Sequence, residues 1–475
     1  MSHQDPAHLE KNYKSNFLQN TEPSFSTDSI NLPFSRSSTP LNYTMSNPAQ
    51  NPTTENHEED DVHLIDESEA AEVIEQEEND MEVDEDDEDT GVVLHNDSSI
   101  YFDSHTDSIF TISAHPTNPD VLLTGGGDDT AYLWTIGPQP NTDNTTTPRA
   151  AHLLAQLTPS HADSIIATAF TQNHAITAGL DGKIQVFSLE APYKLVASAS
   201  EVEEYVWLAA HPTEELFAAG ASDGSVWVYE TPLTPRQVFY NHTASCTAGV
   251  WSRDGSKLVT VSEDGSLYCW DVEAGHATVT LTSDDARFRI DGGLYSVAVS
   301  PSGGVAAVGG ATGEVRVAGL VGEQKGKVLA AVNAHSESVE SISFHPTVPL
   351  MASGSVDGKI VLYDVVRGFA IRATMEAHDE AVVKVEFSGD SWVLTSCGVD
   401  GLLKRWDARS ARELRAFRGH LGGNKEEGEG GILGFVQNKE RIITAGDDGV
   451  ALVFDLTLPG NETGFNVPTV GNPRQ

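Results

Sequence analysis

The feature that most constrains this chain is a unit of strand, turn and strand that recurs along most of its length. The clearest copies read SGSVDGKIVLYD at 353–364, TSCGVDGLLKRWD at 395–407 and TVSEDGSLYCWD at 260–271. In each copy an Asp in a Gly-containing turn stands six residues before a closing aromatic residue. Short β-branched runs on both sides of such a turn predict a β-hairpin.

Alignment on the turn residue gives eight units, seven with Asp and one with Thr: Asp128, Asp181, Asp223, Asp264, Thr312, Asp357, Asp400 and Asp448. Successive turn residues are 41 to 53 positions apart. Repeats of about 40–45 residues with four strands each are typical of β-propellers. We therefore predict an all-β fold, an eight-bladed propeller over residues 91–456. Because an open ring leaves an unpaired strand edge, residues 98–103 are expected to complete the last blade.

The two ends of the chain differ in composition from the repeats. Residues 1–54 are rich in Ser, Thr, Asn, Gln and Pro, and residues 55–90 contain twenty acidic side chains and no Lys or Arg. Such segments cannot bury enough apolar surface to fold alone. We expect a disordered polar region over 1–54, a disordered acidic tract over 55–90 and a C-terminal tail over 457–475.

The charge of the chain bears on its partners. Asp and Glu outnumber Lys and Arg by 71 to 28, and outside the acidic tract 51 acidic residues still face 28 basic ones. Phosphate backbones and anionic membranes attract Lys and Arg, so nucleic acid and membranes are disfavoured as direct partners. A basic protein is the natural complement of such a surface.

The cysteines and the N-terminal segment bear on location. Cys246, Cys269 and Cys397 are too few for a disulfide framework, and none forms a close CxxC pair. The first twenty residues lack the pattern of a signal peptide, and no stretch is long and apolar enough to span a membrane. We expect a cytoplasmic, monomeric protein.

Three stretches extend the pattern beyond a generic repeat. They are SIYFDSHTDSIFTISAHP at 99–116, TGGGDDTAYLW at 124–134 and EVEEYVWLAAHPTEELFAAGASDGSVWVYE at 201–230. With the eight units and the acidic leader, they resemble the WD-repeat family of the angio-associated migratory cell protein, from about residue 60 to 456. The resemblance implies, for the fungal branch, a dedicated chaperone of a large-subunit ribosomal protein that joins the pre-60S particle.

Three blades carry a His, a hydroxyl, the turn Asp and a closing Trp. The sets are His105, Thr124, Asp128 and Trp134; His242, Thr260, Asp264 and Trp270; and His378, Ser396, Asp400 and Trp406. We predict a structural relay in each blade, in which Asp accepts from His and the hydroxyl reaches both His and Trp, because buried polar groups must be paired.

A catalytic interpretation of these sets is disfavoured. An active site is usually one asymmetric constellation, whereas these sets recur in several blades. The histidines lie in different blades and should not converge on a zinc ion. Gly125-Gly126-Gly127 lacks the Lys and following helix of a phosphate loop. No catalytic residue, metal or cofactor is expected.

A partner is expected on the propeller face that carries the turn Asp residues. In each blade three positions should project there: the two that flank the first apolar residue after the His, and the residue before the turn Asp. These positions include acidic and aromatic residues but no Lys or Arg: Glu204, Glu263, Glu340, Asp447, Phe110 and Tyr295. Two acidic loops, 283–291 and 424–429, should reach the same face. Such a surface suits an Arg- and Lys-rich peptide.

Two other functions remain open. Residues 406–409 read WDAR and match the WDxR pattern of substrate receptors of cullin-type ubiquitin ligases, a short and permissive pattern. A signalling scaffold, as suggested for animal relatives, would share the fold. Purification from cells separates these functions, since the ligase receptor would bring a cullin adaptor with it.

Overall fold

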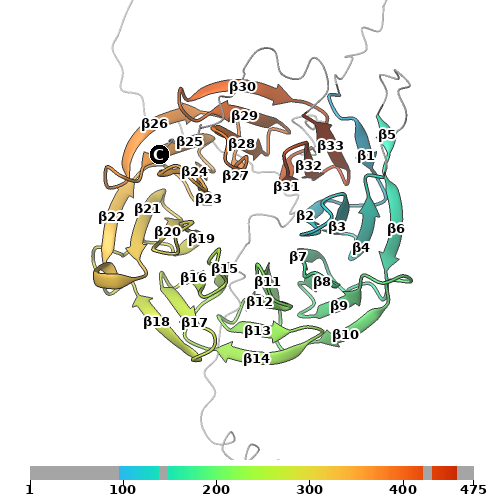
Figure 1. Ribbon diagram of the computed structural model, residues 1–475, viewed down its shortest axis with the longest axis horizontal. Coiled ribbons are helices and arrows are strands. Elements are labelled where there is room, and N and C mark those ends of the chain that lie inside the picture. Colours follow the sequence, from blue (N-terminus) through green and yellow to red (C-terminus); the bar gives the residue numbers. More distant parts are fainter. Residues whose placement is uncertain (1–95, 138–147, 421–429, 457–475) are drawn as a thin grey trace, which may run out of the picture. The chain divides into compact units, whose positions relative to one another are not determined.

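The computed structural model describes residues 96–137, 148–420 and 430–456 of the 475-residue chain. These residues form eight sheets arranged as the blades of one ring around a common centre (Figure 1). The prediction of an all-β, eight-bladed propeller is confirmed. The predicted segments 1–54, 55–90 and 457–475, and the predicted loop 424–429, lie outside the described residues.

The first four blades each have four antiparallel strands that follow one another from the centre outward. Blade one consists of β2 (Ile109–Ala114), β3 (Val121–Gly126), β4 (Ala131–Thr135) and β6 (His152–Leu157). Blade two consists of β7 (Ile165–Phe170), β8 (His174–Gly179), β9 (Ile184–Ser188) and β10 (Leu195–Ala199). Blade three consists of β11 (Tyr205–Ala210), β12 (Leu216–Ala221), β13 (Val226–Glu230) and β14 (Thr234–Phe239). Blade four consists of β15 (Cys246–Trp251), β16 (Leu258–Ser262), β17 (Leu267–Asp271) and β18 (His276–Leu281).

The next three blades repeat this order. Blade five consists of β19 (Leu294–Val299), β20 (Val305–Gly310), β21 (Glu314–Gly319) and β22 (Val328–Asn333), with a 3-10 helix at Gly322–Gln324. Blade six consists of β23 (Val339–Phe344), β24 (Leu350–Ser355), β25 (Lys359–Asp364) and β26 (Ala370–Glu376). Blade seven consists of β27 (Val382–Phe387), β28 (Val393–Gly398), β29 (Leu403–Asp407) and β30 (Arg412–Phe417).

Blade eight joins the two ends of the described chain. Its order is β31 (Ile432–Gln437), β32 (Arg441–Gly446), β33 (Ala451–Asp455), β1 (Ile100–Phe102) and β5 (Arg149–Ala150). Strand β1 pairs antiparallel with β33, with Ile100 opposite Val453, and β5 adds in parallel beside β1. The sequence does not predict β5, which comes from the connection between β4 and β6 and covers the edge that β1 would otherwise expose.

The middle strands of each blade are buried on both faces, because each sheet packs between two neighbours. In blade six, for example, Ile360, Val361, Leu362 and Tyr363 are all fully buried, although successive side chains point to opposite faces. Ile360 and Leu362 share a cluster with blade seven, whereas Val361 and Tyr363 share one with blade five. This two-sided burial explains why the third strand of blade six lacks a polar face.

The turns between the second and third strands are built alike. In blade six, Asp357 accepts a hydrogen bond of 3.0 Å from the backbone N–H of Lys359, and Gly358 adopts a φ of 75°. A residue with a side chain is strained in that conformation, which explains the Asp-Gly pair. The turn Asp therefore fixes the hairpin and the position of the residue before it.

Each inner strand contains a β-bulge at its second residue. In blade one, Ile109 pairs with Gly126 and Thr111 with Gly125, so that Phe110 is the extra residue. The same shift occurs in the other seven blades. A bulge bends the strand and changes the direction of a side chain. In each blade, one residue of the inner strand therefore has no partner in the register of the neighbouring strand.

The ring has two faces, which differ in the connections they carry. The upper face carries the loops that enter the inner strands, such as 103–108 and 240–245, and the turns between second and third strands, such as 127–130 and 263–266. The lower face carries the other two turns of each blade, because strand direction alternates across an antiparallel sheet. The bulges lie at the upper end of each inner strand.

Candidate protein-binding face

Blade seven contains every bond of the predicted relay. His378 donates from Nδ1 to the carboxylate of Asp400 at 2.9 Å, and Ser396 donates to His378 Nε2 at 2.8 Å. Trp406 Nε1 donates to the same Ser396 hydroxyl at 2.9 Å. Burial by itself raises the pKa of Asp400, but the hydrogen bond and the electrostatic interaction with His378 and two backbone N–H groups outweigh burial and lower the pKa. The carboxylate is therefore held ionised as an acceptor.

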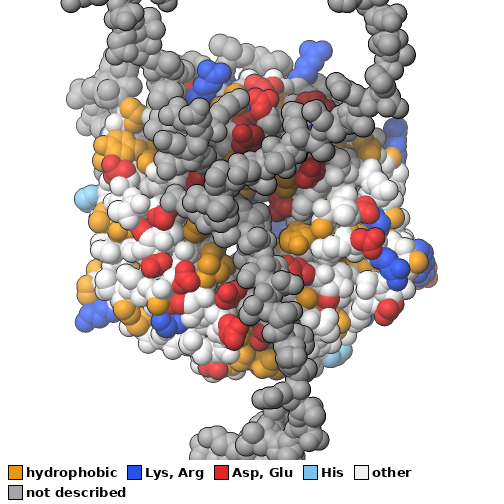
Figure 2. All heavy atoms as spheres, turned by 180° about the vertical axis from the view of Figure 1, so that it is seen from behind, with side chains coloured by type: hydrophobic (Ala, Val, Ile, Leu, Met, Phe, Trp, Pro, Cys, Tyr) orange, Lys and Arg blue, Asp and Glu red, His pale blue; other side chains and the backbone are white. Residues whose placement is uncertain are grey.

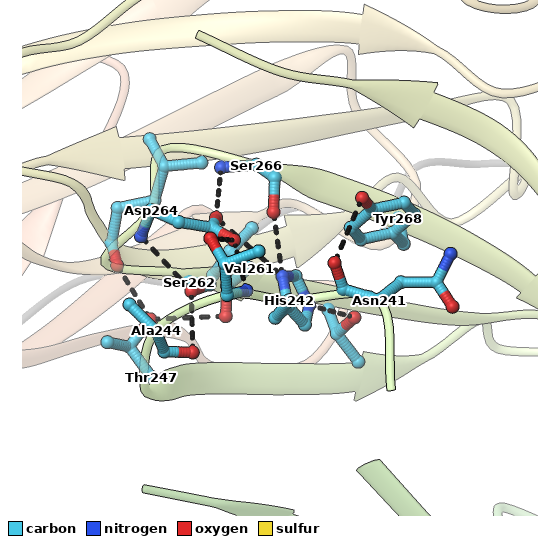
Figure 3. Close-up of polar contacts among 12 residues, drawn as sticks. Asn241, His242, Ala244, Thr247, Val261, Ser262, Asp264, Ser266 and Tyr268 are labelled. Atoms are coloured by element: carbon cyan, nitrogen blue, oxygen red, sulfur yellow. Dashed lines mark hydrogen bonds and ion pairs between the residues drawn. The ribbon is translucent and has the colours of Figure 1, made fainter. Parts of the chain in front are cut away.

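Blade four departs from the prediction at the Asp (Figure 3). His242 Nδ1 lies 2.7 Å from the hydroxyl of Ser266, and Asp264 stands 3.8 Å from that nitrogen. The predicted direct bond from His242 to Asp264 is wrong, because the Ser266 hydroxyl reaches the ring first. Asp264 instead accepts from the backbone N–H groups of Thr243 and Ser266. Thr260 still bonds both His242 and Trp270, at 2.9 and 2.8 Å.

Blade one departs at the Trp. His105 bonds Asp128 at 3.0 Å and Thr124 at 2.9 Å, as in blade seven. The indole Nε1 of Trp134 has no hydrogen-bond partner among the described residues, so the predicted Thr124–Trp134 bond is wrong. The Trp134 ring stacks on Phe102, with centroids 4.8 Å apart and planes within 2°. Phe102 belongs to β1, so this Trp packs against the strand that closes the ring.

The histidine is replaced in blades three and five. In blade three the hydroxyls of Tyr205 and Tyr229 lie 3.2 Å apart, and both residues are fully buried. In blade five Ile290 occupies the position of the histidine. A Cβ added to Gly310 would lie 2.3 Å from Ile290 Cγ2, and a Cβ added to Gly398, the equivalent glycine of blade seven, would lie 2.7 Å from His378 Nδ1. A hydrogen bond between two tyrosine hydroxyls in blade three, and aliphatic packing in blade five, therefore take the place of the histidine relay.

The hydroxyls of the three predicted sets do not reach solvent. Thr124, Thr260 and Ser396 each have 0% relative exposure. A buried hydroxyl that is already bonded to His, and in two blades to Trp, holds its own turn in place. These sets are therefore part of the blade interior and position the upper-face turns.

The predicted acidic residues lie at the upper face at four places around the ring. Glu204 and Glu340 are exposed, and Glu263 and Asp447 are half-buried. Asp447 accepts a hydrogen bond from the hydroxyl of Ser108, which joins blade eight to blade one. The exposed acids are free to meet a partner, whereas Asp447 also links two blades.

Two of the predicted carboxylates lie within electrostatic range of the predicted Tyr295. Burial is the main cause that raises the pKa of the half-buried Tyr295, and the next causes are the carboxylates of Glu263 and Glu340. These residues come from blades five, four and six, and Gly293, two residues before Tyr295, packs against the backbone of Glu263. Glu204, Asp447 and Phe110 lie in other blades of the described ring, apart from this cluster.

Two shallow depressions open on the upper face. The first, about 310 Å³, is lined by the turn of blade four and the loop into blade five, including Glu263, Asp264 and Asp291. The second, about 530 Å³, is lined by Glu201, Glu203 and the turn of blade three with Asp223. Each depression is therefore lined by three carboxylates, and Arg289 also lines the first.

The few basic residues in the described loops and turns of this face are already engaged. Lys183 pairs with Asp181 at 3.2 Å, Arg287 with Asp285 at 2.7 Å and Lys359 with Glu376 at 2.9 Å. Arg289 donates to the carbonyl of Ser283. Arg418 follows the outer strand of blade seven, away from the centre. Figure 2 shows one face of the ring, where Asp and Glu side chains are spread from near the centre to the edge and the visible Lys and Arg side chains lie mainly toward the edge.

Comparison with known proteins identifies the fold and its relatives. A family model described as "WD domain, G-beta repeat" matches residues 97–135, 233–271 and 326–364. The ribosome assembly protein SQT1 of Saccharomyces cerevisiae is 31% identical over 406 residues, which cover 77% of this chain and 88% of the relative. The chain belongs to the WD-repeat family of this protein. The human angio-associated migratory cell protein is 25% identical over 383 residues, which cover 77% and 81% of the two chains.

Solved structures support the same family assignment. The crystal structure of Sqt1 from Chaetomium thermophilum matches with a TM-score of 0.69 and 38% identity, over 76% of this chain and 99% of that chain. A second crystal structure shows that protein bound to the N-terminus of the ribosomal protein L10, again with a TM-score of 0.69 and 38% identity, over 76% and 100% of the chains. The predicted family resemblance is confirmed.

The WDxR residues of this family member lie on the lower face. Arg409 donates from Nε to Asp407 at 3.0 Å, and its carbonyl accepts a hydrogen bond from Arg372 of blade six. The Arg409 side chain is 43% exposed. Its position, in the turn between β29 and β30, is on the opposite face from the acidic residues.

Sequence reasoning missed three histidines on the lower face of the WD-repeat ring. His115, His211 and His345 each accept backbone N–H groups of their own turn at Nδ1 and donate from Nε2 to a carbonyl of the next blade, at 3.0–3.1 Å. Each begins an HPT triplet, and this repetition is the signal that could have revealed them. These bonds join neighbouring blades.

The described residues hold no helix long and apolar enough to cross a bilayer. Within the same residues, no group of three or more His, Cys, Asp and Glu side chains could hold a metal ion. Cys246, Cys269 and Cys397 are all buried and unpaired, and burial raises the pKa of the Cys397 thiol to about 12. This thiol is therefore protonated and poorly nucleophilic at neutral pH.

Proposed function

We propose that this protein is a non-catalytic chaperone that shields the basic N-terminal segment of a newly made large-subunit ribosomal protein and delivers it to the pre-60S particle. The carrying observation is the upper face, where Glu204, Glu263 and Glu340 are available and the basic side chains of the described loops and turns near the centre are engaged. A relative with 38% identity has been crystallised with the N-terminus of the ribosomal protein L10, and this supports the same class of partner here.

The physical task of such a chaperone is to occupy positive charge. A free cationic segment binds RNA without sequence preference, because it releases counterions from phosphates. Carboxylates held on a rigid ring compete for the same Arg and Lys side chains, and their field also raises the rate of encounter. Transfer to the pre-60S particle then requires only that the ribosomal site bind the segment more tightly.

The geometry of the relay sets supports a binding function without catalysis. Their hydroxyls are buried at 0% exposure and are bonded to histidine within the blade. A nucleophile must reach its substrate and face donors for the developing charge, which these positions do not provide. We place the protein in the cytoplasm, where ribosomal proteins are made, as a monomer that binds one basic protein.

Purification of tagged full-length protein from cells, washed at moderate salt, tests this function. We expect a large-subunit ribosomal protein to be recovered in near-stoichiometric amount and to be lost at high salt, because the contacts are ionic. Arg409→Ala serves as the control for the alternative, since it alters the WDxR residues on the lower face. Recovery of a cullin adaptor that disappears in this variant, with no ribosomal protein, would overturn the proposal.

A further inference from the structure

An arginine stands at the same position of the outer strand in blades three and six. Arg236 of β14 and Arg372 of β26 are each the extra residue of a bulge against the third strand. In both blades the bulge lies beside the closing tyrosine of the third strand, Tyr229 or Tyr363. The two arginines are therefore equivalent, one where blade three meets blade four and the other where blade six meets blade seven.

Three carboxylates surround the arginine at the junction of blades three and four. Arg236 lies 3.8 Å from Glu214 and 3.5 Å from Glu230, which both belong to blade three. It also lies 3.6 Å from Glu273, in the turn between β17 and β18 of blade four. At this junction the chain itself neutralises the guanidinium.

Two of these carboxylates have no counterpart at the junction of blades six and seven. Val348 stands in the place of Glu214, three residues after the His of an HPT triplet. Arg409 stands in the place of Glu273, two residues after the Asp that ends the third strand. Arg372 Nη2 donates to the carbonyl of Arg409 at 3.1 Å. A backbone oxygen and a second positive charge thus replace the carboxylate.

Four arginines lie in or beside the two lower-face turns at this junction. We call them the arginine patch: Arg367, Arg372, Arg409 and Arg412. Asp364, the counterpart of Glu230, pairs with Arg367 at 3.6 Å. Asp407 pairs with Arg409 at 3.0 Å. Among the described residues, no carboxylate pairs with Arg372 or Arg412. Two exposed guanidinium groups are therefore left without a carboxylate partner in this part of the chain.

Exposed apolar side chains accompany the arginine patch. They are Val366, Ile371 and Leu414, with exposures of 76%, 46% and 42%. Leu414 stands two residues after Arg412 in β30. Glu413 between them pairs with Lys404 at 3.9 Å. Strands β26 and β30 are the outer strands of neighbouring blades and follow one another along the circumference (Figure 1). The surface therefore combines unpaired positive charge with apolar area.

We propose that the arginine patch binds an acidic segment of a partner protein, in which aliphatic side chains stand between the carboxylates. Each guanidinium presents a planar fork of N–H donors that matches a carboxylate. The aliphatic side chains of the segment pack against the exposed apolar residues of β26 and β30. The unpaired Arg372 and Arg412 carry this proposal, since Asp407 already holds Arg409.

The same surface disfavours nucleic acid as the occupant. A phosphate backbone makes no use of the apolar residues beside the arginines, and a long polyanion is repelled by a chain with a net charge of −43. A short segment brings few charges and gains apolar contact. Because the site lies at the outer edge of the lower face, it leaves the upper face free and is independent of the proposed function.

Three fluorescent probes of equal negative charge test the proposal against full-length protein at physiological ionic strength. The first peptide has Asp and Glu spaced by Leu and Ile, the second has Asp and Glu spaced by Gly and Ser, and the third probe is a single-stranded RNA. We expect the first peptide to bind about tenfold more tightly than the other two probes, because burial of a large apolar side chain is worth about this factor. No binding of the first peptide, or tighter binding of the RNA, overturns the proposal.

A double variant locates the peptide on the arginine patch. Arg372→Gln with Arg412→Gln should weaken the first peptide about tenfold. The control is Arg253→Gln with Lys439→Gln, two exposed residues of lower-face turns in blades four and eight that have no ion pair among the described residues. Melting temperatures establish that both variants are folded. Equal affinity in the patch variant and wild type, or an equal loss in the control, contradicts the proposal.

A single variant restores the carboxylate that blade seven lacks. Arg409→Glu places a carboxylate where blade four has Glu273, so it should pair with Arg372 and weaken the first peptide about tenfold at an unchanged melting temperature. Arg253→Glu, the charge-matched control, should bind as wild type does. Unchanged affinity in Arg409→Glu, or an equal loss in Arg253→Glu, contradicts the role of Arg372.

A photo-crosslinking residue in place of Leu414 identifies the occupant directly. We expect it to capture the first peptide, and capture of residues 55–90 of the same chain in the presence of excess peptide would overturn the proposal. Binding of a basic peptide should be unchanged in the patch variants, because they leave the upper face intact. Failure of this inference is therefore distinguishable from failure of the proposed function.

Discussion

The indole Nε1 of Trp406 donates a hydrogen bond of 2.9 Å to the hydroxyl of Ser396, and both residues are almost completely buried. In blade one the equivalent indole, that of Trp134, has no such partner among the described residues. Both rings occupy the closing position of the third strand. The two blades therefore allow the contribution of one hydrogen bond to be separated from the packing of the ring.

Replacement of each Trp by Phe measures that contribution. Trp406→Phe removes packing and leaves Ser396 without its donor, whereas Trp134→Phe removes packing alone. We expect Trp406→Phe to lower the free energy of unfolding by about 0.5–1.5 kcal/mol more than Trp134→Phe does. Chemical denaturation of both variants measures this difference. Equal losses would mean that the indole bond adds no stability to blade seven.

The pH dependence of stability follows from blade two. Burial lowers the pKa of His161 against the opposing effect of Asp181. For Asp181, burial alone raises the pKa, but hydrogen bonds from Ala162 and His161 outweigh it and lower the pKa to about 2. Both groups bind protons more readily when the chain is unfolded, so stability must fall as the pH falls.

Two pH windows are expected. Below about pH 6.5 the unfolded chain protonates His161, while the folded chain resists. Between about pH 4 and pH 2 the unfolded chain protonates Asp181 before the folded chain does. Urea denaturation from pH 8 to pH 3 should show declining stability below pH 6.5, and His161→Gln should reduce that first decline. An unchanged slope in the variant between pH 6.5 and pH 5 would contradict this assignment.

The seam of the ring depends on a buried arginine. Arg441 of β32 bonds Asp455 of β33 at 2.9 Å and Asp120 of blade one at 2.6 Å. Arg441 and Asp455 are 8% and 7% exposed. Arg441→Met keeps the length of the side chain but leaves Asp455 buried without its arginine, and removal of one member of a buried pair costs about 3–5 kcal/mol.

Arg236 supplies the control for the seam. It pairs with Glu214, Glu230 and Glu273 at 3.5–3.8 Å, and these carboxylates are more than half exposed. Arg236→Met should lower the free energy of unfolding by about 1 kcal/mol or less. Thermal and chemical unfolding of the two variants gives the comparison. A loss at Arg441 no larger than that at Arg236 would show that the seam does not depend on this arginine.

The number of blades could be predicted because seven of the eight hairpins use one Asp six residues before one aromatic residue, and the spacing between them leaves room for the eighth, which has Thr312 in the Asp position. The contacts within a blade were less predictable. Ser266 displaces Asp264 from His242, and nothing in the spacing of these residues indicates which oxygen lies closer to the ring. Whether the Ser266 hydroxyl or the Asp264 carboxylate bonds His242 depends on the folded geometry of the turn.

Part of the candidate site could also be predicted from the positions of residues relative to the repeat. The positions of Glu263 and Glu340 follow from their places beside the turn Asp and the first buried residue. The electrostatic effect of these two carboxylates on Tyr295 could not be predicted, because it depends on the relative orientation of three neighbouring blades. The bulges were also hidden, since a bulge is a property of the register between two strands and requires no particular residue type.

The central claim is that carboxylates of the upper face bind a cationic segment. We expect Glu263→Lys with Glu340→Lys to retain its melting temperature, because neither carboxylate is required for a described contact between strands. The control is Glu190→Lys with Glu440→Lys, two exposed residues in lower-face turns, which changes the net charge equally. Each exposed charge contributes about 1 kcal/mol or less, and reversal of two opposes the segment instead of attracting it.

The most direct measurement is calorimetric titration of full-length protein with a peptide of the basic N-terminal segment of the ribosomal protein, across a range of salt concentrations. The wild-type protein and the lower-face control should bind with similar affinity that weakens steeply with salt. The upper-face variant should bind about tenfold more weakly or not at all. Equal losses in both variants would contradict the account, since binding would then depend on net charge and not on the upper face.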